Sequence, residues 1–156
     1  MNAEAGKLFS EGDRSDATNA VTTGILPDRD IAKLIEGGRI SAEGGVDPSQ
    51  IQPASLDLRL GATAWRVRAS FLPGKSSTVQ AKIDRLKMHQ IDLTKPVVLE
   101  KGCVYIAELM EELKLPADIA GAANPKSSTG RLDIFTRLIT DAGVEFEGVA
   151  AGYKGK

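Results

Sequence analysis

Apolar residues recur at helical spacing near the start of the chain, in the stretch LPDRDIAKLIEGG at residues 26–38. The apolar stripe consists of Ile31, Leu34 and Ile35. Pro27 and Asp28 suit a helix start, and the two glycines after Glu36 supply a stop. The spacing therefore predicts a short helix that packs against the rest of the domain. A second stretch, Ser77 to Lys87, has the same kind of spacing and predicts another short helix.

The rest of the chain reads as short β-type runs separated by Gly and Pro. These runs are LDLRLG at residues 56–61, ATAWRVRA at 62–69, IDLTKPVVL at 91–99, CVYIAELM at 103–110 and DIAGAANP at 118–125. From Ala64 to Arg68, apolar and polar residues alternate, which predicts a strand with one face of each kind. Many short strands without long intervening helices predict a mostly β domain, either a barrel or a sandwich.

The two ends of the chain differ from this pattern. Residues 1–22 are polar and lack a hydrophobic period, so they predict a flexible N-terminal extension before a β domain at 23–156. The last stretch, GVEFEGVAAGYKGK, ends on a turn signal with no strand after Gly155. The domain is therefore expected to be incomplete at its C-terminus.

Composition narrows the class of protein. A length of 156 residues suits one domain, and 42% hydrophobic with 26% charged residues is typical of a globular protein. No run is long enough to span a bilayer, and the polar, acidic N-terminus does not look like a signal peptide, so a cytoplasmic protein without a membrane partner is expected. A net charge of −1 and only 4% aromatic residues argue against binding a nucleic-acid polymer.

The segment from Asn124 to Arg131, NPKSSTGR, carries the strongest chemical signal. Asn-Pro favours a turn, after which Ser127 or Ser128 can cap a short helical turn and leave amides and hydroxyls free for phosphate oxygens. Lys126 and Arg131 add two positive charges, and no acidic residue occurs from residue 121 to 132. The segment predicts a site for a triphosphate. An ordinary helix cap with two solvated basic side chains is the alternative from spacing alone.

The second informative segment is QIQPASLDLRLG, residues 50–61. Its leucines at 56, 58 and 60 alternate with Asp57 and Arg59, so one face of a strand is expected to be apolar and the other to carry a carboxylate and a guanidinium. The simpler interpretation is a half-exposed strand with an ion pair between Asp57 and Arg59.

Four motifs in this order resemble those of dCTP deaminases: PDRDIAKLIEGGRIS, QPASLDLRLG, NPKSSTGR and GYKG. They extend from about Ile25 to Gly155. The resemblance implies the distorted β-barrel of the dUTP diphosphatase-like (β-clip) fold with two short helices, and a homotrimer with active sites between subunits. It also implies hydrolytic deamination of dCTP to dUTP and ammonia, with Mg²⁺ carried by the triphosphate and no zinc.

The same resemblance assigns roles to individual residues. Lys126, Ser127 and Ser128 would contact phosphate, and Ser127 and Arg131 would also order the catalytic site. Tyr153, the aromatic residue of the third motif, would bind substrate. Zinc-dependent base deaminases need a His or Cys, a Glu and a Cys-x-x-Cys pair, whereas this chain has only His89 and Cys103. His89 is expected at the surface or a hinge, and Cys103 is expected to be a buried thiol.

The chain departs from the family pattern in two places. The family usually carries an Asp three residues before the third-motif aromatic, but VAAG precedes Tyr153 here. The catalytic Glu is expected on a strand beyond the GYKG turn, after the last residue, and Glu145 and Glu147 do not match that position. The long segment 133–149 resembles longer bacterial forms with two successive domains.

Three functions therefore remain open. The first is dCTP deamination by the full-length protein. The second is a dUTP diphosphatase or a bifunctional deaminase and diphosphatase, because the fold and the phosphate loop are shared. The third is a catalytically inactive module that binds nucleotide but lacks the catalytic Glu.

Overall fold

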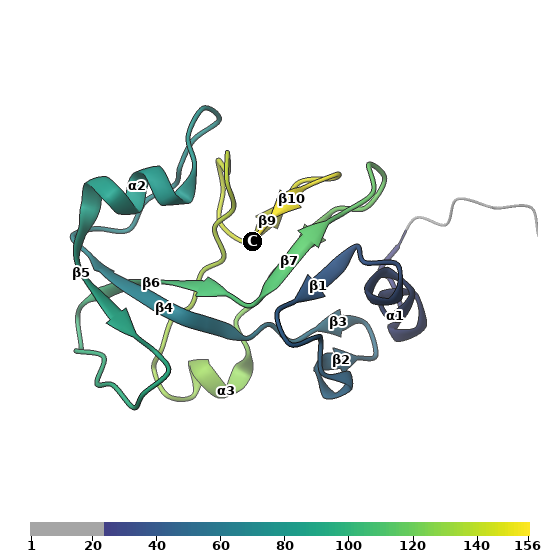
Figure 1. Cartoon of the computed structure of the whole chain (residues 1–156), viewed down its shortest axis with the longest axis horizontal. Coiled ribbons are helices and arrows are strands. Elements are labelled where there is room, and N and C mark those ends of the chain that lie inside the picture. The colour runs from purple at the N-terminus through teal and green to yellow at the C-terminus, as the bar shows by residue number, and fades with distance from the viewer. Residues whose placement is uncertain (1–23) are drawn as a thin grey trace, which may run out of the picture.

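The computed structural model describes residues 24–156, which form a mostly β fold of four small antiparallel sheets and few helices (Figure 1). The predicted N-terminal extension, residues 1–22, lies outside the described residues. Within the described part of the chain, no helix has the length and apolar character needed to cross a membrane.

The largest sheet has β4 (Leu60–Val67) between β5 (Lys87–Asp92) and β6 (Val104–Leu109). The predicted strands at 62–69 and 103–110 are confirmed as β4 and β6. The run predicted at 91–99 is wrong over most of its length, because the strand stops at Asp92 and a turn at residues 93–94 follows. The side chain of Asp92 accepts the Thr94 amide at 2.9 Å, and this local hydrogen bond forms the turn that ends the strand.

The predicted alternation along β4 is interrupted. Ala64 and Val67 are both buried, at 2% and 3% exposure, although they are three residues apart. A register shift against β5 between Arg66 and Val67 breaks the period of two. The buried face is completed by Ile91 of β5 and by Ile83 of α2 (Val79–Leu86), which packs on β4. The helix predicted at 77–87 is thereby confirmed.

A second sheet has β7 (Glu111–Lys114) between β1 (Ile40–Ala42) and β10 (Lys154–Gly155). Beside it lie α1 (Asp28–Glu36), a 3₁₀ turn at Pro48–Gln50 and the β2–β3 hairpin, which pairs Ile51–Gln52 with Ser55–Leu56 (Figure 1). The first predicted helix is confirmed as α1, with Ile31 buried. The C-terminal residues were expected to form only a turn, but β10 pairs with β7.

The remaining elements include the predicted phosphate loop. A small sheet pairs β8 (Gly121–Ala122) with β9 (Gly148–Val149), and α3 (Ser127–Gly130) follows β8. The strand predicted at 118–125 is therefore reduced to two residues. The strand predicted at 56–61 is also wrong in its centre, because residues 57–59 belong to no strand and connect β3 to β4.

The two three-stranded sheets are joined at the bend between β6 and β7, which we call the corner. Only Met110 separates β6 from β7, so the chain passes directly from one sheet into the other (Figure 1). The Met110 amide donates to the carbonyl of Arg59 at 3.0 Å. Arg59 is also the residue before β4, so both chain segments change sheets at this hydrogen bond. The residues around this corner build the candidate site.

Candidate functional site

The predicted phosphate loop forms the short helix α3, preceded by Lys126. Lys126 occupies the N-cap position with an extended backbone and makes no side-chain cap hydrogen bond. The prediction that Ser127 or Ser128 caps this turn is therefore wrong, because both serines lie inside the helix. Instead, the Lys126 carbonyl accepts the Thr129 amide at 3.0 Å and the Thr129 hydroxyl at 2.6 Å.

The loop presents several hydrogen-bond donors to solvent. Lys126, Ser127, Ser128 and Arg131 are all exposed. Within residues 24–156, the amides and hydroxyls of Ser127 and Ser128 have no hydrogen-bond partner. The structure therefore brings the predicted phosphate ligands of this segment together on one short turn, with donors free to meet an anion.

Lys126 differs from the other loop residues because its charge is already paired. Its ammonium forms an ion pair with the carboxylate of Asp57, which lies 69 residues earlier in the chain. The lysine side chain is 62% exposed and the aspartate side chain 31%. The segment 121–132 is therefore less positive in the folded protein than its own sequence indicates, because Asp57 of the segment 50–61 supplies a negative charge beside it.

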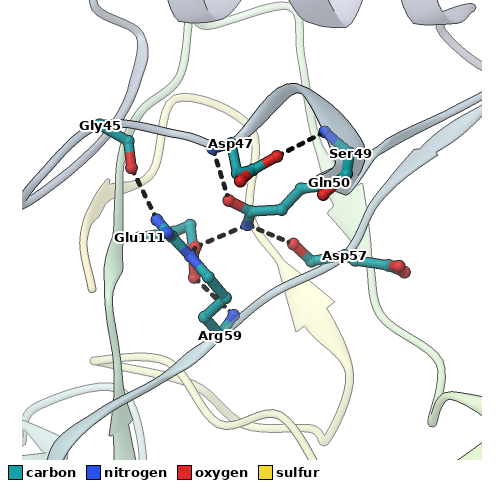
Figure 2. A network of polar contacts seen from close by, with 7 residues as sticks. All are labelled: Gly45, Asp47, Ser49, Gln50, Asp57, Arg59 and Glu111. Carbon is teal, nitrogen blue, oxygen red and sulfur yellow. Dashed lines mark hydrogen bonds and ion pairs between the residues drawn. The ribbon is translucent and has the colours of Figure 1, made fainter.

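The backbone of Asp57 is fixed on both sides by one residue. The Asp57 amide donates to the Gln50 carbonyl at 2.8 Å, and the Asp57 carbonyl accepts from Gln50 Nε2 at 2.7 Å. The Asp57 carboxylate points away from Gln50, as Figure 2 shows, and Gln52 Nε2 lies 3.4 Å from it. This arrangement fixes the backbone that carries the carboxylate paired with Lys126.

Gln50 is in turn held by a buried carboxylate. The side chain of Glu111 is only 1% exposed, and its Oε1 accepts from Gln50 Nε2 at 2.8 Å and from Arg59 Nε at 2.9 Å (Figure 2). Its Oε2 accepts the Arg59 amide at 2.9 Å. The guanidinium of Arg59 also donates to the Gly45 carbonyl at 2.8 Å. Every charge in this network is therefore matched, as burial requires.

The hydrogen bonds of Glu111 control its ionisation. Burial raises its pKa, but the amide and side chain of Arg59 and the side chain of Gln50 lower it by more, so the pKa lies below its ordinary value. Glu111 is consequently a carboxylate near neutral pH. A buried group that is ionised and saturated with donors suits a structural role better than proton transfer.

The predicted ion pair between Asp57 and Arg59 is wrong. Arg59 pairs with Glu111, while Asp57 pairs with Lys126. The apolar face expected beside them is also not buried within this chain, since Leu58 is 43% and Leu60 62% exposed. Sequence reasoning missed Glu111 because nothing in the run MEELK distinguishes the buried Glu111 from its more exposed neighbours.

Tyr153 makes its hydrogen bonds away from the loop. Its hydroxyl donates to the Lys156 carbonyl at 2.8 Å and accepts the Asp141 amide at 3.4 Å. Burial and the negative charge of Asp141 raise the pKa of Tyr153 above its ordinary value. Asp141 also accepts the amide of Val79, at the start of α2, at 2.6 Å. No hydrogen bond among the described residues joins Tyr153 to Lys126, Ser127, Ser128 or Arg131.

Glu147, one of the two glutamates before the final turn, has unusual surroundings. Glu147 Oε2 lies 3.2 Å from Arg137 Nη1, and its Oε1 is buried with no hydrogen-bond partner in residues 24–156. Glu147 also has a positive φ of 63°, which is rare for a side chain of this size. These features distinguish Glu147 structurally but supply no link to the phosphate loop.

The candidate metal ligands are scattered. His89 is exposed on β5, which confirms its predicted surface position. Cys103 was expected to be buried but is only partly so, and its Sγ lies 3.7 Å from Glu100 Oε2. Across residues 24–156, no three His, Cys, Asp or Glu side chains are grouped so that they could hold a metal ion.

Comparisons with known proteins agree on one family. The family model described as the 2'-deoxycytidine 5'-triphosphate deaminase (DCD) N-terminal domain matches residues 22–156. The chain is 34% identical over 111 residues to a "dCTP deaminase, dUMP-forming" of Dictyoglomus thermophilum, covering 70% of this chain and 57% of that protein. A protein of the same name from Corynebacterium kroppenstedtii is 34% identical over 112 residues, covering 72% of this chain and 59% of its own.

A solved structure extends the similarity to three dimensions. The crystal structure of 2'-deoxycytidine 5'-triphosphate deaminase from Agrobacterium tumefaciens matches with a TM-score of 0.81 and 57% sequence identity. The match covers 85% of this chain and 39% of that one. The chain thus spans less than three-fifths of the length of these relatives.

Proposed function

Because the chain belongs to the family of 2'-deoxycytidine 5'-triphosphate deaminase N-terminal domains, we propose that the full-length protein deaminates dCTP by hydrolysis. In this reaction, water adds to C4 of cytosine and ammonia leaves, so that cytosine becomes uracil. The chain itself would supply the phosphate-binding part of the site. The names of its relatives and its own phosphate loop support the same substrate class.

The observation that carries the proposal is the set of exposed donors on α3. The amides and hydroxyls of Ser127 and Ser128, which have no partner among the described residues, suit phosphate oxygens, and Arg131 can form two parallel hydrogen bonds to an anion. Lys126 would add a fourth contact once it leaves Asp57. We assign Ser127 and Arg131 a further part in ordering the catalytic centre, and Tyr153 a part in binding the sugar.

The proposal includes features that depend on the rest of the protein. Magnesium would arrive with the triphosphate, since no three His, Cys, Asp or Glu side chains within residues 24–156 are grouped so that they could hold a metal ion. The general base is assigned to no residue of this chain. Closure of the sheets into a distorted barrel, a homotrimer with sites between subunits, and a cytoplasmic location complete the proposal.

The names of the curated relatives favour a second product. Proteins described as "dCTP deaminase, dUMP-forming" couple deamination to loss of diphosphate by name. The same phosphate loop could serve both steps, because both act on a bound triphosphate. A bifunctional enzyme that converts dCTP to dUMP is therefore the second candidate.

One assay distinguishes these functions. The full-length protein and the 156-residue chain are each incubated with dCTP and Mg²⁺, while ammonia and nucleotides are followed by chromatography. Release of ammonia with dUTP supports simple deamination, and ammonia with dUMP and diphosphate supports the bifunctional enzyme. If the full-length protein binds dCTP but releases no ammonia, deamination is excluded and an inactive binding module is favoured.

A further inference from the structure

We propose that Asp57 is a built-in competitor for Lys126, occupying the lysine in the nucleotide-free protein and giving it up when phosphate binds. The proposal rests on the phosphate loop assigned above and extends it with a residue that controls affinity. Its basis is the ion pair between Asp57 and Lys126, which joins the two motifs across 69 residues of sequence.

The two partners differ in how firmly they are held. Asp57 sits on a backbone that Gln50 bonds at both its amide and its carbonyl, and Gln50 is anchored on buried Glu111. Lys126 has a long flexible side chain that is 62% exposed. When an anion arrives, the lysine can therefore swing away while the carboxylate stays in place.

The pair is weak enough to be exchanged. Ion pairs with a solvent-exposed partner such as Lys126 stabilise a protein only weakly, and salt screens them. A phosphate group carries more charge than a carboxylate and accepts hydrogen bonds at more oxygens, so it can displace Asp57 from Lys126. Phosphate must nevertheless compete with Asp57 for Lys126, and this competition lowers the affinity for phosphate. The Asp57 charge that stays near the loop also repels the ligand.

Two charge effects determine whether loss of the Asp57 carboxylate raises or lowers the affinity for phosphate. Removal of the Asp57 charge abolishes both the competition and the repulsion, which tightens phosphate binding. The opposing effect is that Lys126 loses its preset position, which costs part of one side chain's rotamer entropy. We expect the two charge effects to outweigh this single cost when no divalent cation is present.

The test is a calorimetric titration of the protein with inorganic tripolyphosphate, at low salt and without Mg²⁺. Asp57→Asn should bind about twofold to fivefold more tightly than wild type, as the weakness of surface ion pairs allows. The gain should shrink at high salt. Asparagine keeps the size of the side chain and leaves both backbone hydrogen bonds to Gln50 available, so folding should be preserved.

A matched control is available on α1. Asp30 pairs with Lys33 at 2.8 Å, with 32% and 71% of the two side chains exposed, much as in the pair between Asp57 and Lys126. Asp30→Asn changes the net charge equally and should leave tripolyphosphate affinity unchanged. In a Lys126→Met background, Asp57→Asn should tighten binding less than it does in the wild type.

The outcomes separate this inference from the proposed function. If Lys126→Met weakens binding but Asp57→Asn leaves it unchanged or weaker, the competitor role is wrong and the phosphate loop stands. If Asp30→Asn tightens tripolyphosphate binding as much as Asp57→Asn does, the gain comes from net charge alone, and the competitor role of Asp57 is wrong. Absence of binding in both wild type and Asp57→Asn would overturn the role and the loop together. A gain specific to Asp57→Asn in a protein that does not deaminate dCTP would overturn only the proposed function.

Discussion

Glu111 binds Arg59 through both of its carboxylate oxygens, one to the backbone amide and the other to the side-chain Nε, each at 2.9 Å. Glu111 is the first residue of β7, and Arg59 immediately precedes β4. The pair therefore fastens the corner at which the chain passes from one three-stranded sheet to the other. Through Gln50, the same carboxylate fixes the backbone of Asp57.

Loss of the Glu111 carboxylate should destabilise the fold strongly. In Glu111→Ala, the Arg59 charge and the Gln50 amide lose their buried partner, and removal of one member of a buried pair costs about 3–5 kcal/mol. We expect about 2–4 kcal/mol here, because a third of the Arg59 side chain remains exposed to water. Urea unfolding measures the change.

The control for this substitution is an exposed pair. Glu100 lies 2.7 Å from Arg66, and the Glu100 side chain is 62% exposed. Glu100→Ala should cost less than about 1 kcal/mol. Equal losses in the two variants would contradict the importance of burial at Glu111.

The contribution of Glu111 to the free energy of unfolding should decrease as the pH falls. Its pKa is lower in the folded protein than the ordinary value of 4.5, so the unfolded chain binds more protons in that range. The stabilisation is present above pH 4.5 and is lost as the pH falls toward the folded pKa. The difference in unfolding free energy between wild type and Glu111→Gln should therefore shrink below this pH. A difference that is constant from pH 7 to pH 3 would show that the charge of Glu111 does not matter.

Thr78 should stabilise α2 as its N-cap. Its side-chain oxygen accepts the Ala81 amide at 3.1 Å, satisfying a donor that the helix leaves open. Thr78→Ala should lower the free energy of unfolding by about 1 kcal/mol. Thr78→Ser, which keeps the hydroxyl, should restore most of the loss, and failure of this rescue would point to the lost methyl group instead.

Arg131 and Ser127 should affect turnover far more than stability, because both side chains are exposed in this chain. In the full-length protein, Arg131→Ala or Ser127→Ala should cut the rate of dCTP deamination about 100-fold or more, as loss of a positioned donor in a catalytic site does. Arg85→Ala, which removes the same charge from the exposed face of α2, should leave the rate unchanged. Near-normal rates in both loop variants would remove these residues from the site.

The sequence pattern correctly predicted the helices and strands whose formation depends on interactions between residues close together in the sequence. The helices around Ile31 and Ile83 follow from apolar spacing with stop and cap signals, and both are present. Strands β4 and β6 were recognisable because their residues suit a pleated, partly buried surface. The family resemblance drawn from four motifs is confirmed by the match over residues 22–156.

The errors arise where distant segments meet. The segment 57–59 looked like a strand, but side chains of Gln50 and Glu111 take its backbone groups out of the sheet ladder. Likewise, the positive charge of the loop was judged from its neighbours in sequence, while the acid that pairs with Lys126 is Asp57, which lies between β3 and β4. Contacts between residues that lie so far apart in the sequence produce no periodic pattern from which they could be predicted. The assignments of Ser127, Ser128, Arg131 and Tyr153 to substrate stay predictions.

The corner between the sheets also bears on how the domain opens in solution. The Arg59 amide lies outside every strand, yet it is bonded to a carboxylate that is almost completely shielded from water. Its proton should therefore exchange with deuterium as slowly as those in the centre of β4, rather than at the rate typical of a connecting loop. Slow exchange at this one amide would mean that the corner opens only in openings as costly as those that expose the centre of β4.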